Sequence, residues 1–357
     1  MVEIAEFVAK MTHGNPLVIL DVREPEEFVD WSIPGAINIP LADVTSRVGE
    51  IPEGELVVVC ARGARATQAA GILRDLGLDP DVLDQGMAAW ARAFSTATQS
   101  FGSVKVIQLQ RRGKGCLAYL VGSGDECVVI DPPLDVERIM ELAEGQGWRV
   151  GTVVDTHVHA DHVSGASLLA NLTGADYLVN DADDVGRGTG SLCDSQEIGF
   201  GGSKLRVMFT PGHTRGSTTF VLDDHALFTG DVLMIESVGR PDLADKAEEF
   251  AHQLYASLQA LMQFDDEAVV FPAHYGPRLL VPFGEMIKTT IGTLRTNQPA
   301  LAFGEDEFVA WASAAATNRP PSYQQIVALN MAIEEPSPEA ASDLEIGPNR
   351  CAVSAPN

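Results

Sequence analysis

The sequence is poor in basic residues. It has 24 lysines and arginines against 50 aspartates and glutamates, which gives a formal net charge of −26 at pH 7. Nucleic-acid binding depends on lysine and arginine meeting phosphates, so this balance argues against a nucleic-acid partner. The acidic surface suits a protein kept soluble in high salt, and it suits an ordinary acidic cytoplasmic enzyme equally well.

Long apolar runs are also lacking. No window approaches the ~18 consecutive apolar residues of a membrane-spanning helix, so we expect no membrane partner. The start, MVEIAEFVAKM, lacks the basic and continuous apolar segments of a signal peptide. Hydrophobic residues make up 45% of 357 residues, which is enough apolar mass for two globular domains.

Cysteines are few and form no pairs. An odd number without a CxxC motif is no disulfide framework, and it suggests a reducing, cytoplasmic location where a thiol can do chemistry. The five are Cys60, Cys116, Cys127, Cys193 and Cys351. The sequence leaves the oligomeric state open, and a homo-oligomer is compatible with it.

The first 95 residues alternate apolar runs with helical patterns. LVILDV (17–22) and LVVVCA (56–61) are typical of buried strands, and ATQAAGILRDLG (66–77) predicts a helix that ends at a glycine. We therefore predict a small α/β domain over 1–95 with a mostly parallel sheet. The next stretch is small and polar without an apolar face, so we place a linker at 96–102.

From about residue 103 the rhythm changes to strands in succession with helices set between them. The predicted strands are VKVIQLQ, CLAYLVGS, CVVIDP, TVVDTH, KLRVMFT, TTFVLDD, ALFTGD and AVVFPAH, and the predicted helices cover 135–147, 164–173, 246–264 and 281–296. This pattern predicts two sheets covered by helices over 103–335. The acidic, Pro/Ser-rich segment 336–357 is expected to be disordered.

A cysteine motif follows the second predicted strand. Cys60 ends that strand, and CARGAR leads into a helix, whose N-terminal N–H groups favour a thiolate and a bound anion. Arg62 and Arg65 add positive charge, and Gly63 lets the loop curl back. We interpret Cys60 as a nucleophile that accepts sulfane sulfur as a persulfide, with these three residues cradling the anionic donor. The alternative is a small apolar side chain that closes a buried strand.

These motifs resemble a rhodanese domain. The resemblance covers nearly all of 1–95 and rests on DVREPEEF (21–28), IPGAINIP (33–40), CARGARA (60–66) and LDQGMAAW (83–90). It implies that Cys60 carries the persulfide and that Asp21 and Arg23 give structural support.

The chain departs from the rhodanese pattern in two places. It has Trp31 and Ser32 where Gly-His usually precedes Ile-Pro-Gly, and Gln85-Gly86 where Gly-Gly is usual. Both departures bear on the preference for a sulfur donor more than on sulfur transfer itself.

A second cluster begins at THVHADH (156–162), which holds three of the eight histidines. Side chains two apart in an extended segment share a face, and the following turn swings the next ligands round. FTPGH, FTGD and FPAH place further candidates at strand ends, which converge at one edge of a sandwich. A lone histidine is usually a satisfied core or surface residue, but imidazoles and carboxylates together suit zinc, iron or manganese. The candidates are His157, His159, Asp161, His162, His213, Asp231 and His274.

This spacing resembles the metallo-β-lactamase superfamily, which implies an αββα sandwich with a metal at one edge over about 103–332. VVIDPPLD, GDVLMIESVGRPDL and RPPSYQQIVALNM resemble its persulfide dioxygenase branch and the related rhodanese fusions. That branch implies one Fe(II) per chain, held by His157, His213 and Asp231, a triad with open positions. The remaining candidates, His159, Asp161, His162 and His274, would then lie behind the ligands or form a vestigial second site.

Two further residues are implied to bind the substrate. Arg240 in GRPDL matches a position that contacts the thiol, with a structural ion pair to Asp242 as the alternative. Tyr275 follows His274 and is expected to line the same pocket. Asn297-Gln298-Pro299-Ala300 lacks the arginine that follows Asn-Pro in glutathione-using members, which points to a thiol other than glutathione.

Three functions remain open on the sequence alone. The first is a bifunctional enzyme that oxidises a low-molecular-weight thiol persulfide with O₂ to sulfite and thiol, and moves sulfane sulfur through Cys60, with thiosulfate as one product. The second is a dinuclear zinc thioester hydrolase of the glyoxalase II type. The third is a non-catalytic persulfide carrier or sensor.

Overall fold

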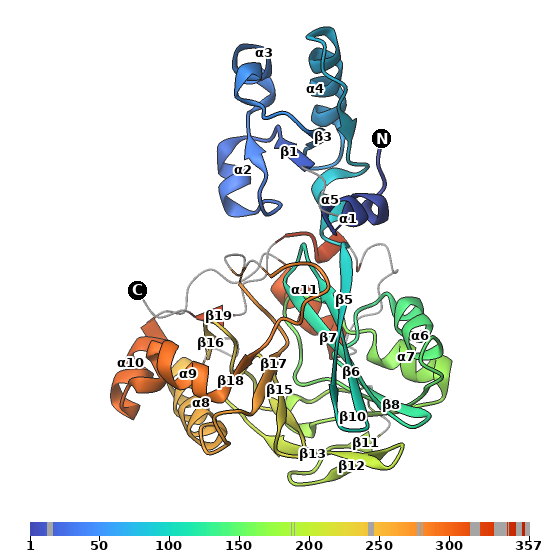
Figure 1. Cartoon of the computed structure of the whole chain (residues 1–357). Coiled ribbons are helices and arrows are strands. Elements are labelled where there is room, and N and C mark those ends of the chain that lie inside the picture. Colours follow the sequence, from blue (N-terminus) through green and yellow to red (C-terminus); the bar gives the residue numbers. More distant parts are fainter. Residues whose placement is uncertain are drawn as a thin grey trace.

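The computed structural model describes residues 1–12, 17–186, 188, 190–241, 246–276, 279, 281–314, 322–331, 341, 343–347 and 352–353. It has two parts, a small α/β unit and a larger two-sheet unit (Figure 1). Among the described residues, no helix combines the length and apolar character needed to cross a membrane.

The N-terminal unit is a four-stranded parallel sheet in the order β2-β1-β3-β4. Its strands are β1 (Leu17–Asp21), β2 (Ile37–Asn38), β3 (Glu55–Val59) and β4 (Asp81–Val82). Its α-helices are α1 (Ile4–Thr12), α2 (Pro25–Asp30), α3 (Val44–Arg47), α4 (Ala64–Asp75) and α5 (Gly86–Trp90). Both faces of the sheet are packed against apolar side chains, as expected for buried parallel strands.

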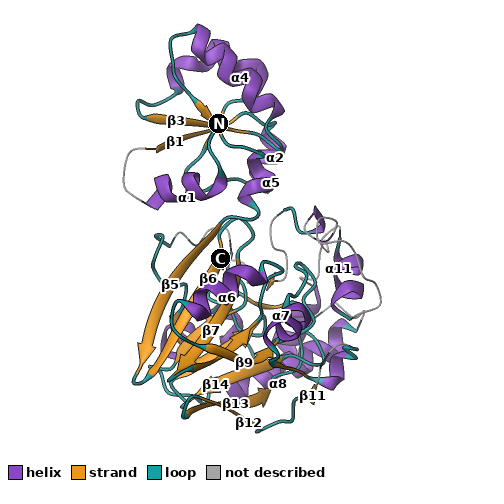
Figure 2. Ribbon diagram, turned by 90° about the vertical axis from the view of Figure 1, so that its right-hand side faces the viewer, coloured by secondary structure: helices purple, strands orange, loops and turns teal. Residues whose placement is uncertain are grey.

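The larger unit stacks a seven-stranded sheet on a six-stranded sheet, with helices outside both (Figure 2). The first sheet holds β5 (Phe94–Phe101), β6 (Val104–Arg111), β7 (Cys116–Ser123), β8 (Glu126–Ile130), β9 (Arg149–Val154), β10 (Asp176–Val179) and β11 (Gly190–Ser191). The second holds β12 (Glu197–Phe200), β13 (Ser203–Phe209), β14 (Thr218–Leu222), β15 (Ala226–Gly230), β17 (Val269–Pro272) and β18 (Thr289–Thr290). The predicted αββα sandwich is therefore confirmed.

Helices cover the outer faces of both sheets. α6 (Val136–Glu144) and α7 (Ala166–Thr173) pack on the first sheet. The second sheet is covered by α8 (Ala247–Leu261), α9 (Ile291–Asn297) and α10 (Glu305–Ala314), and α11 (Tyr323–Asn330) follows them along the chain. A separate apolar core lies between the two sheets.

Two predicted elements are wrong. The expected linker 96–102 lies almost entirely in β5, which pairs along its length with β6 at the sheet's edge. An edge strand bonds on one side only and can stay half exposed, so it needs no continuous apolar face. The predicted helix over 281–296 begins only at Ile291, because Thr290 caps it by accepting a hydrogen bond from the amide of Thr293.

The predicted disorder of the C-terminal segment is also wrong in part. Glu345 is 3% exposed, and Leu344 packs beside a small core that includes Val163. Residues 336–340, 342, 348–351 and 354–357, together with the predicted boundary at 335/336, lie outside the described residues.

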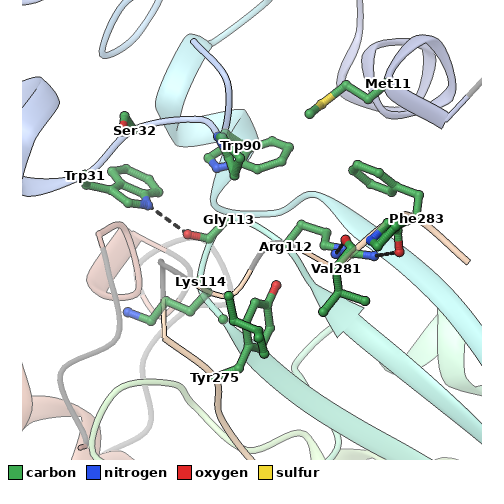
Figure 3. A pocket seen from close by; sticks show the side chains of 14 residues that line it. Met11, Trp31, Ser32, Trp90, Arg112, Gly113, Lys114, Tyr275, Val281 and Phe283 are labelled. Carbon is green, nitrogen blue, oxygen red and sulfur yellow. Dashed lines mark hydrogen bonds between the residues drawn. The ribbon is translucent and has the colours of Figure 1, made fainter. Parts of the chain in front are cut away.

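The two units touch directly. The indole Nε1 of Trp31 donates to the carbonyl of Gly113 across the boundary, 2.8 Å away (Figure 3). Trp31 and Ser32, which stand where rhodaneses usually have Gly-His, therefore lie at the boundary between the units, and Trp31 joins the two.

Candidate metal centre and sulfur-transfer loop

The metal-ligand candidates all lie beyond strand ends. His157 and its neighbours follow β9 and precede α7, His213 follows β13, Asp231 follows β15, and His274 follows β17. These strands belong to both sheets, so the structure brings all seven predicted candidates to one edge of the sandwich, within three adjoining groups.

Three of them form a compact set. The Nε2 atoms of His157 and His213 each lie 3.6 Å from Oδ2 of Asp231. The residues are 5%, 0% and 1% exposed, and none of these three atoms has a hydrogen-bond partner. Buried polar atoms without partners are costly, so their convergence fits a cation. Two imidazoles and one carboxylate on one side of an ion leave its other positions open.

The opposite ring nitrogens are fixed by hydrogen bonds. Nδ1 of His213 donates to the carbonyl of Arg240 at 3.0 Å. Thr156 Oγ1 gives its hydrogen to Asp131 at 2.9 Å, so it accepts from Nδ1 of His157, also at 2.9 Å. Both rings therefore present an Nε2 lone pair, which is the tautomer that a metal ligand requires.

The charges of the set are also suitable. Burial together with the neighbouring His157 lowers the pKa of His213 to about 4, so this imidazole is neutral near pH 7. Burial alone would raise the pKa of Asp231, but His274 and His157 hold it well below its usual value. In this set His213 is thus neutral and Asp231 anionic. Burial alone would lower the pKa of His157, but Asp231 outweighs it and raises that pKa. A Cβ on Gly239 would lie 2.3 Å from the carbonyl oxygen of Asp231, so the approach of β16 (Val238–Gly239) requires glycine there.

His159 belongs to a different set. Its Nε2 lies 3.1 Å from Oδ1 of Asp131, and burial followed by the charges of His162 and His157 lowers its pKa to about 3. The neutral ring donates through Nε2, and its buried Nδ1 has no partner. Asp131 also accepts from the backbone amide of Thr156 at 2.6 Å, so one carboxylate orients this part of the motif. Asp131 stands in VVIDPPLD, but nothing in the sequence alone gave it this role.

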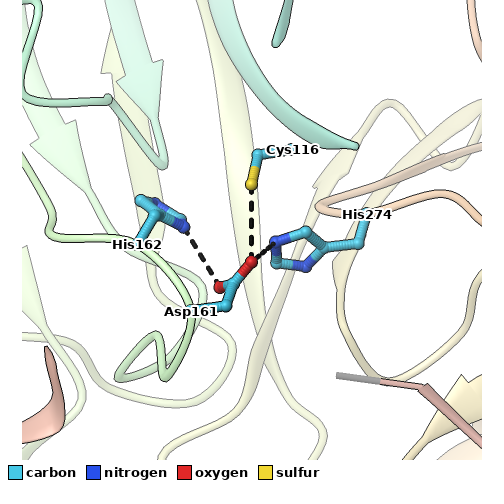
Figure 4. Close-up of side chains that lie close together, drawn as sticks. All are labelled: Cys116, Asp161, His162 and His274. Atoms are coloured by element: carbon cyan, nitrogen blue, oxygen red, sulfur yellow. Dashed lines mark hydrogen bonds and ion pairs between the residues drawn. The ribbon is translucent and has the colours of Figure 1, made fainter. Parts of the chain in front are cut away.

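The remaining candidates form a four-residue group with Cys116 (Figure 4). Asp161 lies 3.4 Å from Nδ1 of His162, 2.9 Å from Nε2 of His274 and 3.5 Å from the Cys116 sulfur. The other nitrogen of His274, Nδ1, donates to Oδ1 of Asp231. Burial alone would lower the pKa of His274, but Asp161 and Asp231 outweigh it and raise the pKa well above its usual value. His274 thus lies between two carboxylates and is hydrogen-bonded to Asp231.

Cys116 was missed by the sequence reasoning. Burial and Asp161 raise the pKa of its thiol, His274 and His162 oppose them, and the net effect is a lowered pKa. In the sequence, the one signal was its position at the start of a predicted strand. In the structure, an isolated bridge to His274 holds Cys116 at the same edge of the sandwich as the metal-ligand candidates.

Neither of the two predicted substrate residues, Arg240 and Tyr275, lines the cavity that lies beside His213. A cavity of about 280 Å³ is lined by His213, Val158, Arg215 and Tyr323 among others, but by neither Arg240 nor Tyr275. Arg240 is 3% exposed. Tyr275 lines a separate cavity at the domain boundary, and burial raises its pKa to about 12.

The C-terminal segment holds the metal loop in place. Asn330 donates through Nδ2 to the carbonyls of His159 and His162 at 2.8 and 2.9 Å. Glu345 accepts from the amide of Val163 at 2.6 Å and pairs with buried Arg111 at 2.5 Å. Sequence reasoning missed both, because nothing local in the sequence links residues so far apart along the chain.

The cysteine loop has the expected form at the end of β3. Cys60 is 1% exposed, and its sulfur accepts from the amide of Gly63 at 3.1 Å. Gly63 has φ +100°, a conformation that favours glycine. A Cβ on Gly86 would lie 1.9 Å from the carbonyl oxygen of Cys60. Of the Gly-Gly pair usual in rhodaneses, this chain therefore retains the glycine that the loop requires.

The two loop arginines differ from the expected cradle. Arg65 forms a double hydrogen bond with Glu27 at 2.7 and 2.9 Å, and that partner takes up its charge. Arg62 is exposed and lies 3.8 Å from Asp343 of the C-terminal segment. Near the loop, Arg23 forms a buried ion pair with Asp21 at 2.6 Å.

Comparison with known proteins agrees with this architecture. Family models match residues 4–93 as a rhodanese-like domain and 111–274 as the metallo-β-lactamase superfamily. Bovine (Bos taurus) mitochondrial persulfide dioxygenase ETHE1 is 33% identical over 223 residues, covering 61% of this chain and 84% of the relative. The chain belongs to the persulfide dioxygenase branch of the metallo-β-lactamase superfamily and carries a rhodanese-like domain.

The chain is also similar to a solved structure of the same branch and to a hydrolase. The crystal structure of ETHE1 from Myxococcus xanthus superposes with a TM-score of 0.57 at 26% identity, covering 67% of this chain and 99% of that one. A hydroxyacylglutathione hydrolase of Acidiphilium cryptum is 36% identical over 159 residues, covering 44% of this chain and 63% of the relative. The metal-binding part of the chain is thus similar in sequence to proteins with two different named activities.

Proposed function

We propose that this protein is a persulfide dioxygenase that also transfers sulfane sulfur. The metal centre would carry out RSSH + O₂ + H₂O → RSH + H₂SO₃, in which the outer sulfur loses four electrons and O₂ gains them. His157, His213 and Asp231 would hold one Fe(II), which when bound supplies a coordination site for O₂ and a thiolate side by side.

One observation carries this proposal. The ligand atoms of His157, His213 and Asp231 converge on one another in a set of their own. His274, a ligand that a two-metal site would need, gives its Nδ1 hydrogen to Asp231 and lies with Nε2 2.9 Å from Asp161. The four-residue group therefore supports the ligand set from behind, through the hydrogen bond from His274 to Asp231. It positions Asp231 by occupying Oδ1 and leaving Oδ2 for the ion.

Residues around the ligand set would orient the two imidazoles and enclose the substrate. Hydrogen bonds to Arg240 and Thr156 hold the two imidazoles in the tautomer that a metal needs. We place the persulfide in the 280 Å³ cavity beside His213, where Tyr323 provides an apolar wall. Arg240 would act by orienting His213 through its backbone, and the thiol we expect is one other than glutathione.

Cys60 would carry the transferred sulfur. Its thiolate would attack the outer sulfur of a persulfide, RSSH, forming Cys60–S–SH and releasing RS⁻. Sulfite from the metal centre would then take the outer sulfur to give thiosulfate and regenerate the thiolate. The amide of Gly63 donates to this sulfur at 3.1 Å and would stabilise its negative charge.

The test uses the full chain loaded with Fe(II) in an oxygen electrode, with several thiol persulfides. Asp231→Asn should lose the metal and persulfide-dependent O₂ uptake, while the exposed control Asp125→Asn retains both. Cys60→Ser should abolish sulfur transfer to cyanide or sulfite and spare O₂ uptake, and the exposed Cys193→Ser should alter neither. Loss of O₂ uptake in Cys60→Ser would refute the division of roles.

A dinuclear zinc hydrolase is the second candidate, because the four-residue group also places Cys116 and Asp161 as potential ligands and hydroxyacylglutathione hydrolases are related. It requires two metals per chain and thioester cleavage. The carrier hypothesis instead predicts that Asp231→Asn leaves function intact. We further propose that the rhodanese-like domain ends where β5 begins, near residue 94, that the metal-binding domain follows directly, and that the protein is cytoplasmic. Sedimentation would establish the assembly state.

A further inference from the structure

A second large cavity lies where the two units meet (Figure 3). Its volume is about 340 Å³, within the range of small-molecule sites. Trp31 and Trp90 line it from the rhodanese-like unit, and Lys114, Tyr275 and Phe283 line it from the metal-binding unit. It is separate from the cavity beside His213, with which it shares no lining residue.

The walls are mostly apolar and held in place. Trp90 is 1% exposed, and Trp31 is bonded to Gly113. Arg112 also lines the cavity, but its guanidinium donates to Ser95 and to two backbone carbonyls and stacks 4.4 Å from the Phe283 ring. Arg112 is therefore part of the wall, and its charge is already used.

Lys114 is different. It is 6% exposed, and among the described residues none accepts a hydrogen bond from its ammonium or forms an ion pair with it. Figure 3 shows its side chain running along the cavity wall below Trp31. This ammonium is therefore available to pair with an anionic group of a bound molecule. A single lysine on a mostly apolar wall suits a ligand that brings one anionic group.

The shape and lining narrow the ligand class. A bare inorganic anion would fill a small part of 340 Å³ and leave the indole faces unused. A molecule with one carboxylate and an apolar body meets both the charge and the walls. Gly115 and Tyr275 line the cavity, and each directly precedes or follows a member of the Cys116/His274 pair, so the site adjoins the metal domain's edge.

We propose that this cavity binds a low-molecular-weight thiol bearing a carboxylate, with the carboxylate on Lys114 and the apolar part between Trp31, Trp90 and Phe283. The choice of a thiol among organic carboxylates rests on the proposed function. Because the ligand touches both units, its binding should also tighten their contact. The site would hold the thiol between the two reaction centres.

The test is tryptophan emission and calorimetry on the metal-loaded full chain with 3-(methylthio)propionate, whose blocked sulfur cannot ligate a metal as a thiolate. We expect saturable quenching, because two of the four tryptophans line the cavity. Cysteamine, a thiol without a carboxylate, should give none. Glutathione and 3-mercaptopropionate then distinguish a large from a small carboxylate-bearing thiol.

Lys114→Met is the decisive variant, with Lys105→Met as the control since Lys105 pairs with Gln146 on the surface. Lys114→Met should weaken binding at least ~10-fold, and Lys114→Arg should restore most of it. The ligand-free Tm should change little in Lys114→Met, because the ammonium has no partner among the described residues and methionine keeps an apolar stem of similar length. A lower Tm with unchanged affinity would assign Lys114 a structural role and overturn the proposal.

Absence of saturable binding to the unaltered chain would also overturn it. Neither result depends on persulfide oxidation, so failure of the cavity proposal is distinguishable from failure of the proposed function, which O₂ uptake reports.

Discussion

Glu345 is expected to be a major source of stability for the metal loop, although it lies in an acidic stretch with disorder-prone composition. Its carboxylate and the Arg111 guanidinium are 4% and 6% exposed at the side chain and lie 2.5 Å apart. Burial alone would lower the pKa of Arg111, and Glu345 outweighs it, so the pair is charged. Removing one partner of such a pair leaves a buried charge uncompensated, at a cost of ~3–5 kcal/mol.

The perturbation is Glu345→Ala, measured as the free energy of unfolding of the metal-binding unit in urea. We expect a loss of ~3–5 kcal/mol, and faster hydrogen exchange at the amide of Val163, which loses its acceptor. The control is Glu197→Ala, whose exposed pair with Lys204 should contribute at most ~1 kcal/mol. The double variant Arg111→Met/Glu345→Leu should recover most of the loss.

Equal effects of Glu345→Ala and Glu197→Ala would show that the buried pair contributes no more than an exposed one. An unchanged exchange rate at Val163 would show that the hydrogen bond contributes nothing to holding the loop.

Two further predictions concern the rhodanese-like unit. Gly86→Ala should displace the Cys60 loop, since its Cβ would lie 1.9 Å from a backbone oxygen; sulfur transfer to cyanide should fall while O₂ uptake persists, and Gly71→Ala, with open space around it, is the control. Retained transfer in Gly86→Ala would contradict the proposed loop geometry. The Arg65 hydrogen bonds lower the pKa of Glu27 to about 2, below its unfolded value, so the pair stabilises above pH ~4.3 and the contribution is lost as pH falls through 2. Because both side chains are about one-third exposed, Glu27→Gln should cost at most ~1 kcal/mol at pH 6, with the difference vanishing near pH 2 in urea unfolding; a difference that grew on acidification would contradict the sign.

Local patterns in the sequence were sufficient to predict the edge-of-sheet cluster. THVHADH, FTPGH, FTGD and FPAH each follow an apolar run, and runs of that kind become strands whose ends meet. The division of those residues into separate groups could not be predicted, because it depends on which carboxylate each imidazole faces in the folded protein. His159 and His274 differ in which carboxylate they face, and no spacing rule encodes that.

The misses have a common physical cause. β5 is stabilised by pairing with β6, Glu345 by contact with Arg111, and Cys116 by its bridge to His274. Each is a tertiary contact between distant residues, which overrides local composition. Composition alone made β5 look like a linker and the tail look disordered.

The most direct test of the central claim is the metal content of the purified chain, measured together with the stoichiometry of O₂ uptake on adding a thiol persulfide. We expect one iron per chain and one O₂ consumed for each sulfite formed, with both lost in Asp231→Asn. Two zinc ions per chain with no persulfide-dependent O₂ uptake, even after iron loading, would contradict it.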